Sequence, residues 1–456
     1  MSAETRPAPS RSSFRNPDFV KLWTAGTISM LGTQVSQIAI PFIAVLLLHV
    51  PPIQVALLGT LEFLPFLLFT LPAGVWVDRL PRRRILISGD VGRAIMLLTI
   101  PIAFAFGALT IWQLYVVAFV NGILTVFFDI ADQSYLPTVL DRDQLVDGNA
   151  KLSASMSTAQ VVGQPLGGGI VAILGGPFAV LLDAVSYVAS AVLIFAIRRT
   201  ERASRPDPAA AGAEAQEVAD AASSGANVAA ELGAARSEAH DARPGVRREV
   251  AAGLRFVLRN RYLRSIAATT GSTNLFTNIL FSIFPIFVYV NLGLTPETVG
   301  LIGGGIGAGA LVGAVTAGRF ANRVGIGRAV VASSIVAGPV ALLIPVASHD
   351  TALLLIGGGG AIGGWANSVY NINQISLRQA ITPEPMLGRM NATMRFMVWG
   401  TIPIGQVIGG LVATAFSPLA AIWLGAIGGL FTFLPVFFSP VRTLERIPDA
   451  EPAAAA

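Results

Sequence analysis

Twelve stretches of about 20 mostly apolar residues run through this sequence and restrict its fold more than any other feature. A helix of that length crosses the hydrocarbon core of a bilayer with its backbone hydrogen bonds made internally. Only 12% of the residues are charged, whereas soluble proteins carry roughly 25%. One such stretch can be a buried helix of a soluble protein, but the polar remainder is too small to cover twelve. The sequence therefore predicts an all-α membrane protein and argues against soluble enzymes, nucleic-acid binders and disordered chains.

The predicted spans form two sets of six. The first set covers residues 22–48, 55–77, 85–106, 111–130, 152–174 and 178–197, and the second covers 266–290, 299–320, 329–347, 352–374, 393–416 and 419–438. Residues 198–248 are rich in Ala, Arg, Glu, Asp, Ser and Gly, which predicts a polar linker. We expect five parts, namely an N-terminal tail (1–18), a six-helix bundle (19–197), the linker (198–248), a second bundle (249–440) and a C-terminal tail (441–456).

Basic residues are concentrated in alternate connections between the predicted spans. One set of connections contains Arg79, Arg82–Arg84, Arg142, Lys151, Arg323, Arg328, Arg378 and Arg389. The other set, residues 50–52, 107–110, 175–177, 291–298, 348–351 and 417–418, contains no lysine or arginine. By the positive-inside rule we expect a protein of the inner (plasma) membrane with both termini and the linker in the cytoplasm. The net charge of +5 then reflects topology, and no nucleic-acid partner is expected.

The two sets of spans also repeat one another in sequence. Residues 74–84 (GVWVDRLPRRR) follow the second span, and a related segment, 318–328 (GRFANRVGIGR), follows the eighth span 244 positions later. Residues 163–168 (GQPLGG) return as 405–410 (GQVIGG) after 242 positions. Matched pairs at a nearly constant offset indicate two parallel six-helix repeats related by an axis along the membrane normal.

This organisation resembles the major facilitator superfamily of transporters. Segment 74–84 is similar to that family's loop signature between spans two and three, and segment 163–168 is similar to the span-five signature of its antiporter branches. Segments 19–23, 73–79, 182–184 and 252–260 resemble the bacterial branch that exports macrolides and the siderophore enterobactin. The resemblance implies two pseudo-symmetric bundles of six helices, alternating access to a midplane site, and export of substrate.

The resemblance also implies a conformational latch, a contact made in one conformation and broken in the other. Its residues here are Gly74, Asp78, Arg79 and Arg83. The alternative is that Arg82–Arg84 are only topology anchors that bind anionic lipid headgroups. The second repeat has Asn322 in place of Asp78, so we expect the two gates to differ.

The span-five motif consists of Gly163, Pro165, Gly167 and Gly168. Small residues let helix backbones approach closely, and proline removes one backbone hydrogen bond. We expect this span to pack tightly on a facing helix at the interface between the two halves. The alternative is generic glycine packing without a directional role.

Ionisable residues inside spans cost about 2.5–3.5 kcal/mol each and are therefore functional candidates. We expect Glu62, Asp183 and Asp129 to act in proton coupling or substrate binding, with a buried structural hydrogen bond as the alternative. Asp90 and Arg93 of span three and Asp129 and Asp132 of span four lie at the cytoplasmic ends of those spans and are expected to form a salt-bridge network with Arg79, with purely structural pairing as the alternative. Many proton-coupled drug antiporters carry an arginine early in span four, and residues 111–122 contain none.

Polar and aromatic residues in spans one, four, seven and ten suit a roomy amphipathic cavity. The candidates for its lining are Gln34, Gln37, Phe128, Asn274, Asn278, Tyr370 and Asn371. A mostly apolar cavity with few polar anchors fits lipophilic drug-like or siderophore-like ligands.

The sequence shows no motif for metal binding, nucleotide binding or catalysis. The sequence has no cysteine, only three scattered histidines and no phosphate-binding loop, so we expect no metal site, no cofactor and no enzyme activity. The expected partners are a small-molecule substrate, protons and membrane lipids, and the expected state is a monomer. The alternatives are an uptake or facilitated-diffusion permease for a metabolite, or a non-transporting membrane receptor on the same scaffold.

Overall fold

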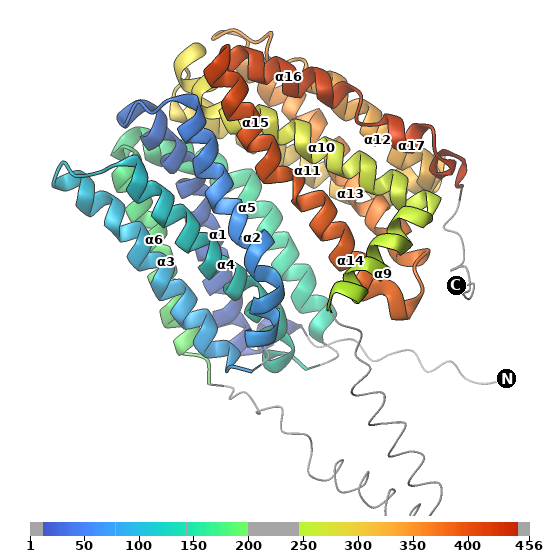
Figure 1. Cartoon of the computed structure of the whole chain (residues 1–456). Helices are drawn as coiled ribbons and strands as arrows, with labels where there is room; N and C mark the ends of the chain where they lie inside the picture. The colour runs from blue at the N-terminus through green and yellow to red at the C-terminus, as the bar shows by residue number, and fades with distance from the viewer. Residues whose placement is uncertain (1–11, 78, 142–143, 199–245, 446–456) are drawn as a thin grey trace, which may run out of the picture.

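The computed structural model describes residues 12–77, 79–141, 144–198 and 246–445, and all regular structure in these ranges is helical (Figure 1). The first half comprises α1 (Pro17–Phe42) with its π-helical continuation η2 (Ile43–Leu47), α2 (Pro52–Val77), α3 (Arg82–Ala105), α4 (Ile111–Val139), α5 (Leu145–Leu174) and α6 (Gly176–Phe195). Asp78, most of the linker expected at 198–248 and most of both expected tails lie outside the described residues.

The second half comprises α9 (Val246–Arg259), α10 (Arg261–Ile286) with η4 (Phe287–Asn291), α11 (Pro296–Val324), α12 (Ile326–Ala341), η5 (Leu353–Gly358) with α13 (Gly359–Ala380), α14 (Glu384–Trp399) with α15 (Thr401–Ala415), and α16 (Pro418–Leu430) with α17 (Leu434–Phe437). Short 3-10 turns, η1 (Ser13–Arg15) and η6 (Pro440–Thr443), flank the described chain. Among the described residues, nine segments are long and apolar enough to cross a membrane by length and composition. With α5, α12 and η5–α13 they make the two sets of six spans that the sequence predicts.

Helix boundaries differ from the predicted spans where helices extend beyond their apolar runs. α4 continues to Val139 and α5 begins at Leu145, because hydropathy detects only the lipid-facing part of a helix. Span eleven is divided into α14 and α15 at Gly400. α9 is a separate helix that the hydropathy pattern does not predict, since its arginines keep it below the hydropathy of a span.

The two halves pack their helices in the same pattern. α1 contacts α5 and α6, and α10 correspondingly contacts α15 and α16. α4 lies between α2 and α3, as α13 lies between α11 and α12, and α3 packs on α6 as α12 packs on α16. Equivalent pairings in equivalent places show the internal repeat as a structural repeat.

The halves meet through α5 with α11 and α2 with α15. We call the end where the described termini lie the terminus end, and the opposite end, with connections 48–51 and 292–295, the turn end. The contacts of Gly168 with Gly300 and of Ala56 with Gly410 lie toward the turn end, as does the edge-to-face pair Phe42 and Tyr289 at 5.6 Å. Figure 1 shows the bundles together at this end and diverging toward the terminus end.

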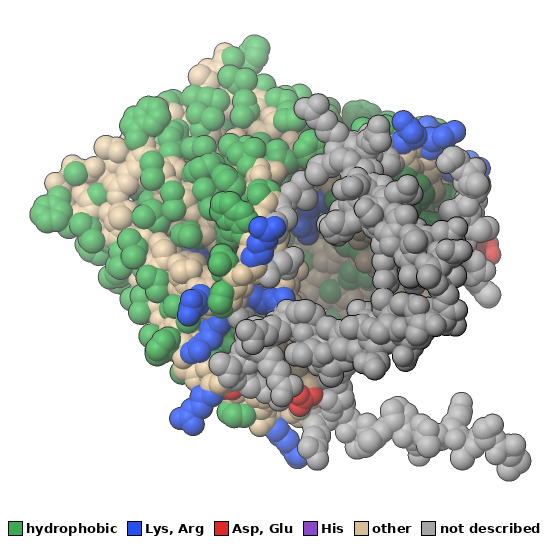
Figure 2. Space-filling model, turned by 60° about the horizontal axis from the view of Figure 1, so that its bottom comes forward, with side chains coloured by type: hydrophobic (Ala, Val, Ile, Leu, Met, Phe, Trp, Pro, Cys, Tyr) green, Lys and Arg blue, Asp and Glu red, His purple; other side chains and the backbone are tan. Residues whose placement is uncertain are grey.

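Large apolar side chains are exposed over much of the surface. Trp112, Val192 and Phe416 are among those more than half exposed. Figure 2, which brings the terminus end forward, shows hydrophobic side chains over the visible flank and Lys and Arg gathered at the end itself. An apolar flank of this kind is stable against lipid and not against water.

Candidate functional site

An ion pair is buried inside the first bundle. The Arg93 guanidinium donates a hydrogen bond to Asp90 Oδ1 at 2.5 Å, and both side chains are at most 5% exposed. The residues are three apart on α3, so one helix face presents both. The Arg93 guanidinium also lies 4.1 Å from the centroid of the Phe128 ring and 4.3 Å from that of Tyr187. Asp90 Oδ2 is buried and accepts no hydrogen bond from the described part of the chain.

Asp183 of α6 lies in the same interior. Its carboxylate accepts hydrogen bonds from Ser36 Oγ at 2.5 Å and from Ser186 Oγ at 3.2 Å, and the residue is 1% exposed. Tyr187, one turn further along α6, pairs its hydroxyl with Thr33 Oγ1 at 2.9 Å. α1 and α6 are thus joined by polar side chains at mid-depth, where lipid offers no alternative partner.

Asp129 and Asp132 of α4 complete a group that we call the Arg93 cluster: Asp90, Arg93, Asp129, Asp132 and Asp183. Arg93 interacts electrostatically with each of the four acids. Asp129 is exposed and Asp132 is half-buried, whereas Asp90 and Asp183 are buried. The cluster therefore combines one exposed, one half-buried and two buried carboxyl groups around a single guanidinium.

The sequence predicts a network of Asp90, Arg93, the two acids of α4 and Arg79, and leaves Asp183 outside it. In the structure the guanidinium that interacts with these acids is that of Arg93, whereas Arg79 is exposed. Sequence places Asp183 in the turn-end half of its span, and only the packing of α3 against α6 brings it to Arg93. The available signal was the presence of a charged residue in each of three neighbouring spans.

A second polar group joins α1 and α5. Gln164 Nε2 donates hydrogen bonds to Gln34 Oε1 at 2.7 Å and to Gln37 Oε1 at 3.1 Å. Gln164 also lies against Gly303 of α11, so these amides stand where three helices from both halves meet. The structure thus brings together the predicted cavity residues Gln34 and Gln37 and adds Gln164.

Glu62 lies on α2 with its side chain exposed, and no described residue donates a hydrogen bond to it. Phe66, one turn along the same face, lies 6.2 Å from Trp399 of α14 between ring centroids. The Arg395 guanidinium lies over the Trp399 ring at 4.8 Å. Phe66 and Trp399 thus meet between α2 and α14, and Glu62 and Arg395 each lie one helical turn away on the same helices.

The other predicted cavity residues belong to α10 and α13 of the second bundle. Asn274 Nδ2 donates to the Val398 carbonyl at 3.0 Å, and Asn278 Nδ2 donates to the Asn274 carbonyl at 2.9 Å. Tyr370 is buried in an apolar cluster of the second bundle, where its hydroxyl pairs with Thr270 at 2.8 Å. Asn371 is half-buried and donates to Asn367 on its own helix.

The span-five glycines lie at two helix contacts. Gly163 and Gly167 face Gln34 of α1, while Gly168 faces Gly300 of α11. Pro165 packs against Gly304 of α11. Pro165 and Gly168 therefore stand at the boundary between the halves, while Gly163 and Gly167 allow the close approach of α1 within the first bundle.

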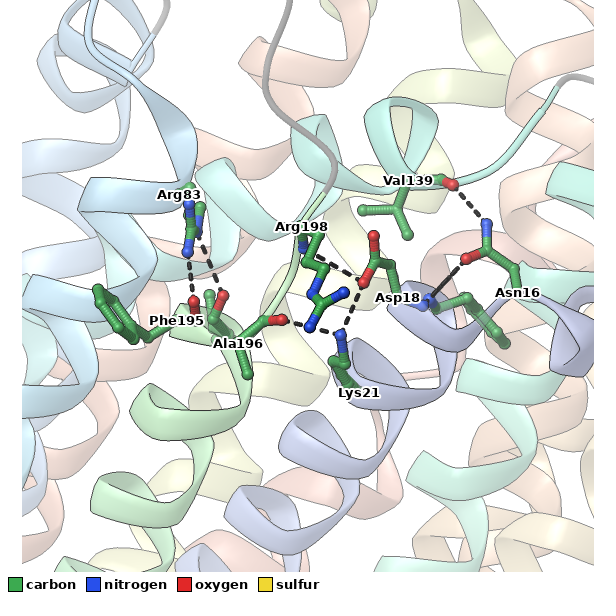
Figure 3. Close-up of polar contacts among 10 residues, drawn as sticks. Asn16, Asp18, Lys21, Arg83, Val139, Phe195, Ala196 and Arg198 are labelled. Atoms are coloured by element: carbon green, nitrogen blue, oxygen red, sulfur yellow. Dashed lines mark hydrogen bonds and ion pairs between the residues drawn. The ribbon is translucent and has the colours of Figure 1, made fainter.

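The residues of the predicted latch occupy different environments. Asp78 is outside the described residues, Arg79 is exposed, and the position of Gly74 has open space around it. Arg83 donates hydrogen bonds to the carbonyls of Ile194, at 3.3 Å, and of Phe195, and so caps the end of α6 (Figure 3).

Figure 3 also shows the polar contacts that join α1, α4 and α6 at the terminus end. Asn16 caps α1 and donates to the Val139 carbonyl at 2.8 Å, while Lys21 donates to the Ala196 carbonyl at 2.8 Å. Asp18 accepts from Lys21 at 2.9 Å and from the Arg198 backbone N–H at 3.2 Å. Arg83 therefore belongs to a set of contacts that closes this end of the first bundle.

Known transporters resemble this chain over part of its length or nearly all of it. The multidrug efflux pump Tap of Mycobacterium bovis (strain BCG / Pasteur 1173P2) is 26% identical over 454 residues, which cover 97% of this chain and 98% of Tap. YkuC of Bacillus subtilis, an uncharacterized MFS-type transporter, is 27% identical over 43% of this chain and 45% of its own length. The enterobactin exporter EntS of Citrobacter koseri is 26% identical over 44% and 48%. The matches to YkuC and EntS span less than half of those relatives.

The fold also matches a solved transporter. The crystal structure of a bacterial homologue of the iron transporter ferroportin, in an inward-facing state, superposes with a TM-score of 0.71 over 94% of this chain and 99% of that one. At 15% identity this likeness shows the fold alone. A family model described as Major Facilitator Superfamily matches residues 22–289 and 266–455. Because the match covers both halves of a structurally repeated helical fold, this chain belongs to the Major Facilitator Superfamily and is a multi-pass membrane transporter, not an enzyme.

Proposed function

We propose that the protein exports an amphipathic small molecule, of a drug, macrolide or siderophore-like kind, in exchange for protons. It works by alternating access in the inner (plasma) membrane, with both termini and the linker in the cytoplasm. Similarity over nearly the whole chain to a multidrug efflux pump supports export, and similarity to an enterobactin exporter supports a siderophore-like substrate. The alternating placement of arginine and lysine supports the orientation.

The Arg93 cluster is the observation that supports proton coupling, because it contains four carboxyl groups and one guanidinium. Arg93 forms its ion pair with Asp90, at 2.5 Å. No described lysine, arginine or histidine lies within ion-pairing distance of Asp183. A buried carboxylate ion costs several kcal/mol unless it is paired or takes up a proton. Asp183 is therefore the proton-binding group, held by Ser36 and Ser186.

Asp129 is the member of the Arg93 cluster that exchanges protons with water in this proposal. Its exposed carboxylate and the buried Asp183 both interact with Arg93, so a change of charge at one is felt by the other. Arg93 also supplies from α3 the guanidinium that many proton-coupled drug antiporters of this superfamily carry on span four. The coupling unit is thus built within the first bundle.

The substrate binds between the bundles, on the face formed by Glu62 and Phe66 of α2 with Arg395 and Trp399 of α14. The rings accept the apolar body of an amphipathic molecule, and the two charged groups orient its polar part. Gln34, Gln37 and Gln164, where α1 and α5 meet α11, offer a second group of polar contacts for the substrate. Both bundles contribute, so their relative rotation changes the affinity of the site.

The conformation fits the loading step of an exporter. With the termini in the cytoplasm, the bundles are joined on the outer side and separated on the cytoplasmic side. Gly168 with Gly300 and Ala56 with Gly410 form the outer closure, which must open to release substrate. Gly74, Asp78 and Arg79 are the cytoplasmic latch in this proposal. Transport by an Asp78→Asn variant at the normal rate would contradict that role.

The test is dye efflux in everted membrane vesicles with an imposed pH gradient. Asp183→Asn should reduce gradient-driven transport at least tenfold and abolish its pH dependence, while dye exchange without a gradient continues. Glu62→Gln should change dye affinity, and Arg323→Gln, an exposed change outside the cluster, should change neither. Unchanged gradient-driven transport by Asp183→Asn would refute proton coupling at this residue. Uptake against the expected direction would indicate a permease, and absence of any uncoupler-sensitive transport would indicate a receptor.

A further inference from the structure

A cavity of about 430 Å³ opens at the terminus end of the second bundle, away from the interface between the halves. It lies between α12, α17 and η6. Its lining includes Arg328, Arg442 and Thr443 on the polar side and Val331, Ile335 and Phe437 on the apolar side. Two guanidinium groups beside an apolar wall are suited to a molecule with an anionic head and a hydrocarbon tail.

Neither arginine forms a close ion pair with a described residue. The Arg328 guanidinium lies 4.0 Å from Glu445 Oε1, and both side chains are well exposed, at 65% and 78%. Such a separated, exposed pair contributes little. The Arg442 guanidinium lies 5.7 Å from the Phe437 ring centroid, which holds it at the rim of the apolar wall. The cavity thus retains donors for one anionic group.

The position of the cavity matches the boundary of the hydrocarbon layer. α12 packs on α11, α13 and α16 within its own bundle, so its outer side faces away from the other half. Ile335 on that side is exposed, and Phe438 beside the cavity wall is 76% exposed. The exposed apolar residues place the surface next to acyl chains, while the arginines mark headgroup level.

The internal repeat shows how the sequence of the second half leaves room for this opening. At the equivalent position of the first half, Arg83 caps the end of α6 and its guanidinium lies over Phe195 at 5.5 Å. The offset of 244 places Gly327 there in the second half. The Gly327 N–H donates to the Leu444 carbonyl at 3.0 Å, and a Cβ would collide with the Val441 carbonyl. Glycine at this position lets the backbone of η6 approach that of α12 directly.

We propose that this cavity is a binding site for an anionic phospholipid. The lipid phosphate accepts hydrogen bonds from Arg328 and Arg442, and an acyl chain lies along Ile335 and Phe437. The site is separate from the substrate surface between α2 and α14, so it does not depend on which molecule is transported.

The test is lipid binding to the full-length protein purified in detergent, measured by native mass spectrometry. The probes are phosphatidylglycerol, phosphatidylcholine with the same acyl chains, and inorganic phosphate as a competitor. We expect preferential retention of phosphatidylglycerol, no displacement by inorganic phosphate, and at least tenfold weaker binding in the double variant Arg328→Ala/Arg442→Ala. The matched control Arg323→Ala, an exposed arginine of α11 outside the cavity, should stay within twofold of the parent.

Each other outcome overturns the proposal. Equal phosphatidylglycerol binding by the double variant would place the lipid elsewhere. An equal loss in Arg323→Ala would show only diffuse attraction to a basic surface, and displacement by inorganic phosphate would indicate a site for a soluble anion. Arg328→Lys/Arg442→Lys, which keeps the charge, should retain most of the binding and shows whether a loss reflects misfolding.

Discussion

Gly168 of α5 and Gly300 of α11 hold the two halves of the transporter in backbone contact: a Cβ added to Gly168 would lie 3.0 Å from the Gly300 Cα. The repeat places Gly410 of α15 against Ala56 of α2 in the equivalent position. Closure of the turn end thus depends on two small-residue contacts, which can separate without breaking an ion pair.

Gly168→Val should force the turn end open. The added side chain has no space against α11, and overpacking of this kind costs about 1–3 kcal/mol. Because the chain has no cysteine, a single Val45→Cys change provides a reporter within the closed turn end, where Val45 is buried. A membrane-impermeant maleimide should label it several-fold faster in the Gly168→Val background. Gly169→Val is the control, because the space around Gly169 is open. Equal labelling in both backgrounds would contradict this account of closure.

Arg93→Gln should be strongly destabilising. Removal of one partner from a buried ion pair leaves an uncompensated charge and typically costs about 3–5 kcal/mol. The double variant Asp90→Asn/Arg93→Gln removes both charges and should recover most of the lost stability without restoring proton-driven efflux. Thermal unfolding in detergent measures the first effect, and vesicle transport the second. If the double variant is no more stable than Arg93→Gln, the pair with Asp90 does not dominate the energetics of the cluster.

Arg83→Ala should lower the free energy of unfolding by about 1–3 kcal/mol, the usual value of hydrogen bonds to a charged donor. The change uncaps the Ile194 and Phe195 carbonyls at the end of α6. Arg84→Ala, an exposed neighbour, is the control for loss of one positive charge. Thermal unfolding should separate the two variants. Parent-like stability with lost transport in Arg83→Ala would instead favour a latch role for this residue.

The hydrogen bonds of Asp147 with Ser13 should make the packing of η1 against α5 sensitive to acid. Hydrogen bonds from Lys151 and Ser13 lower the pKa of Asp147 from 3.8 to about 2. Because the folded pKa is depressed, the stabilisation is complete above about pH 4 and disappears as the pH falls through about 2. Amide hydrogen-exchange protection factors at residues 13–16 should fall in that window. Asp147→Asn should give low protection at every pH, and a pH-independent profile in the parent would contradict the assignment.

The sequence predicts the parts of this structure that depend on local composition. Apolar runs define spans because every lipid-facing residue must be apolar, and the repeat of 74–84 at 318–328 indicates matching bundles. The proximity of Asp183 to Arg93 depends on which face of α3 packs against α6, and a hydropathy pattern does not specify that face. The contact of Arg395 with Trp399 is an i,i+4 pair on α14 and follows from helix geometry, whereas the approach of Trp399 to Phe66 of α2 does not follow from the sequence. Arg83 could not be identified as a cap of α6 until the end of that helix was placed beside it.

The central claim is that the Arg93 cluster exchanges a proton for substrate, and proton release on substrate binding tests it most directly. The purified protein in weakly buffered detergent solution is mixed with a transported dye, and the pH change is followed with an indicator. The account predicts proton release from the parent and from Arg323→Gln, and none from Asp183→Asn when the dye is bound to saturation. Equal proton release from Asp183→Asn, or dye binding by the parent without any proton release, would contradict it.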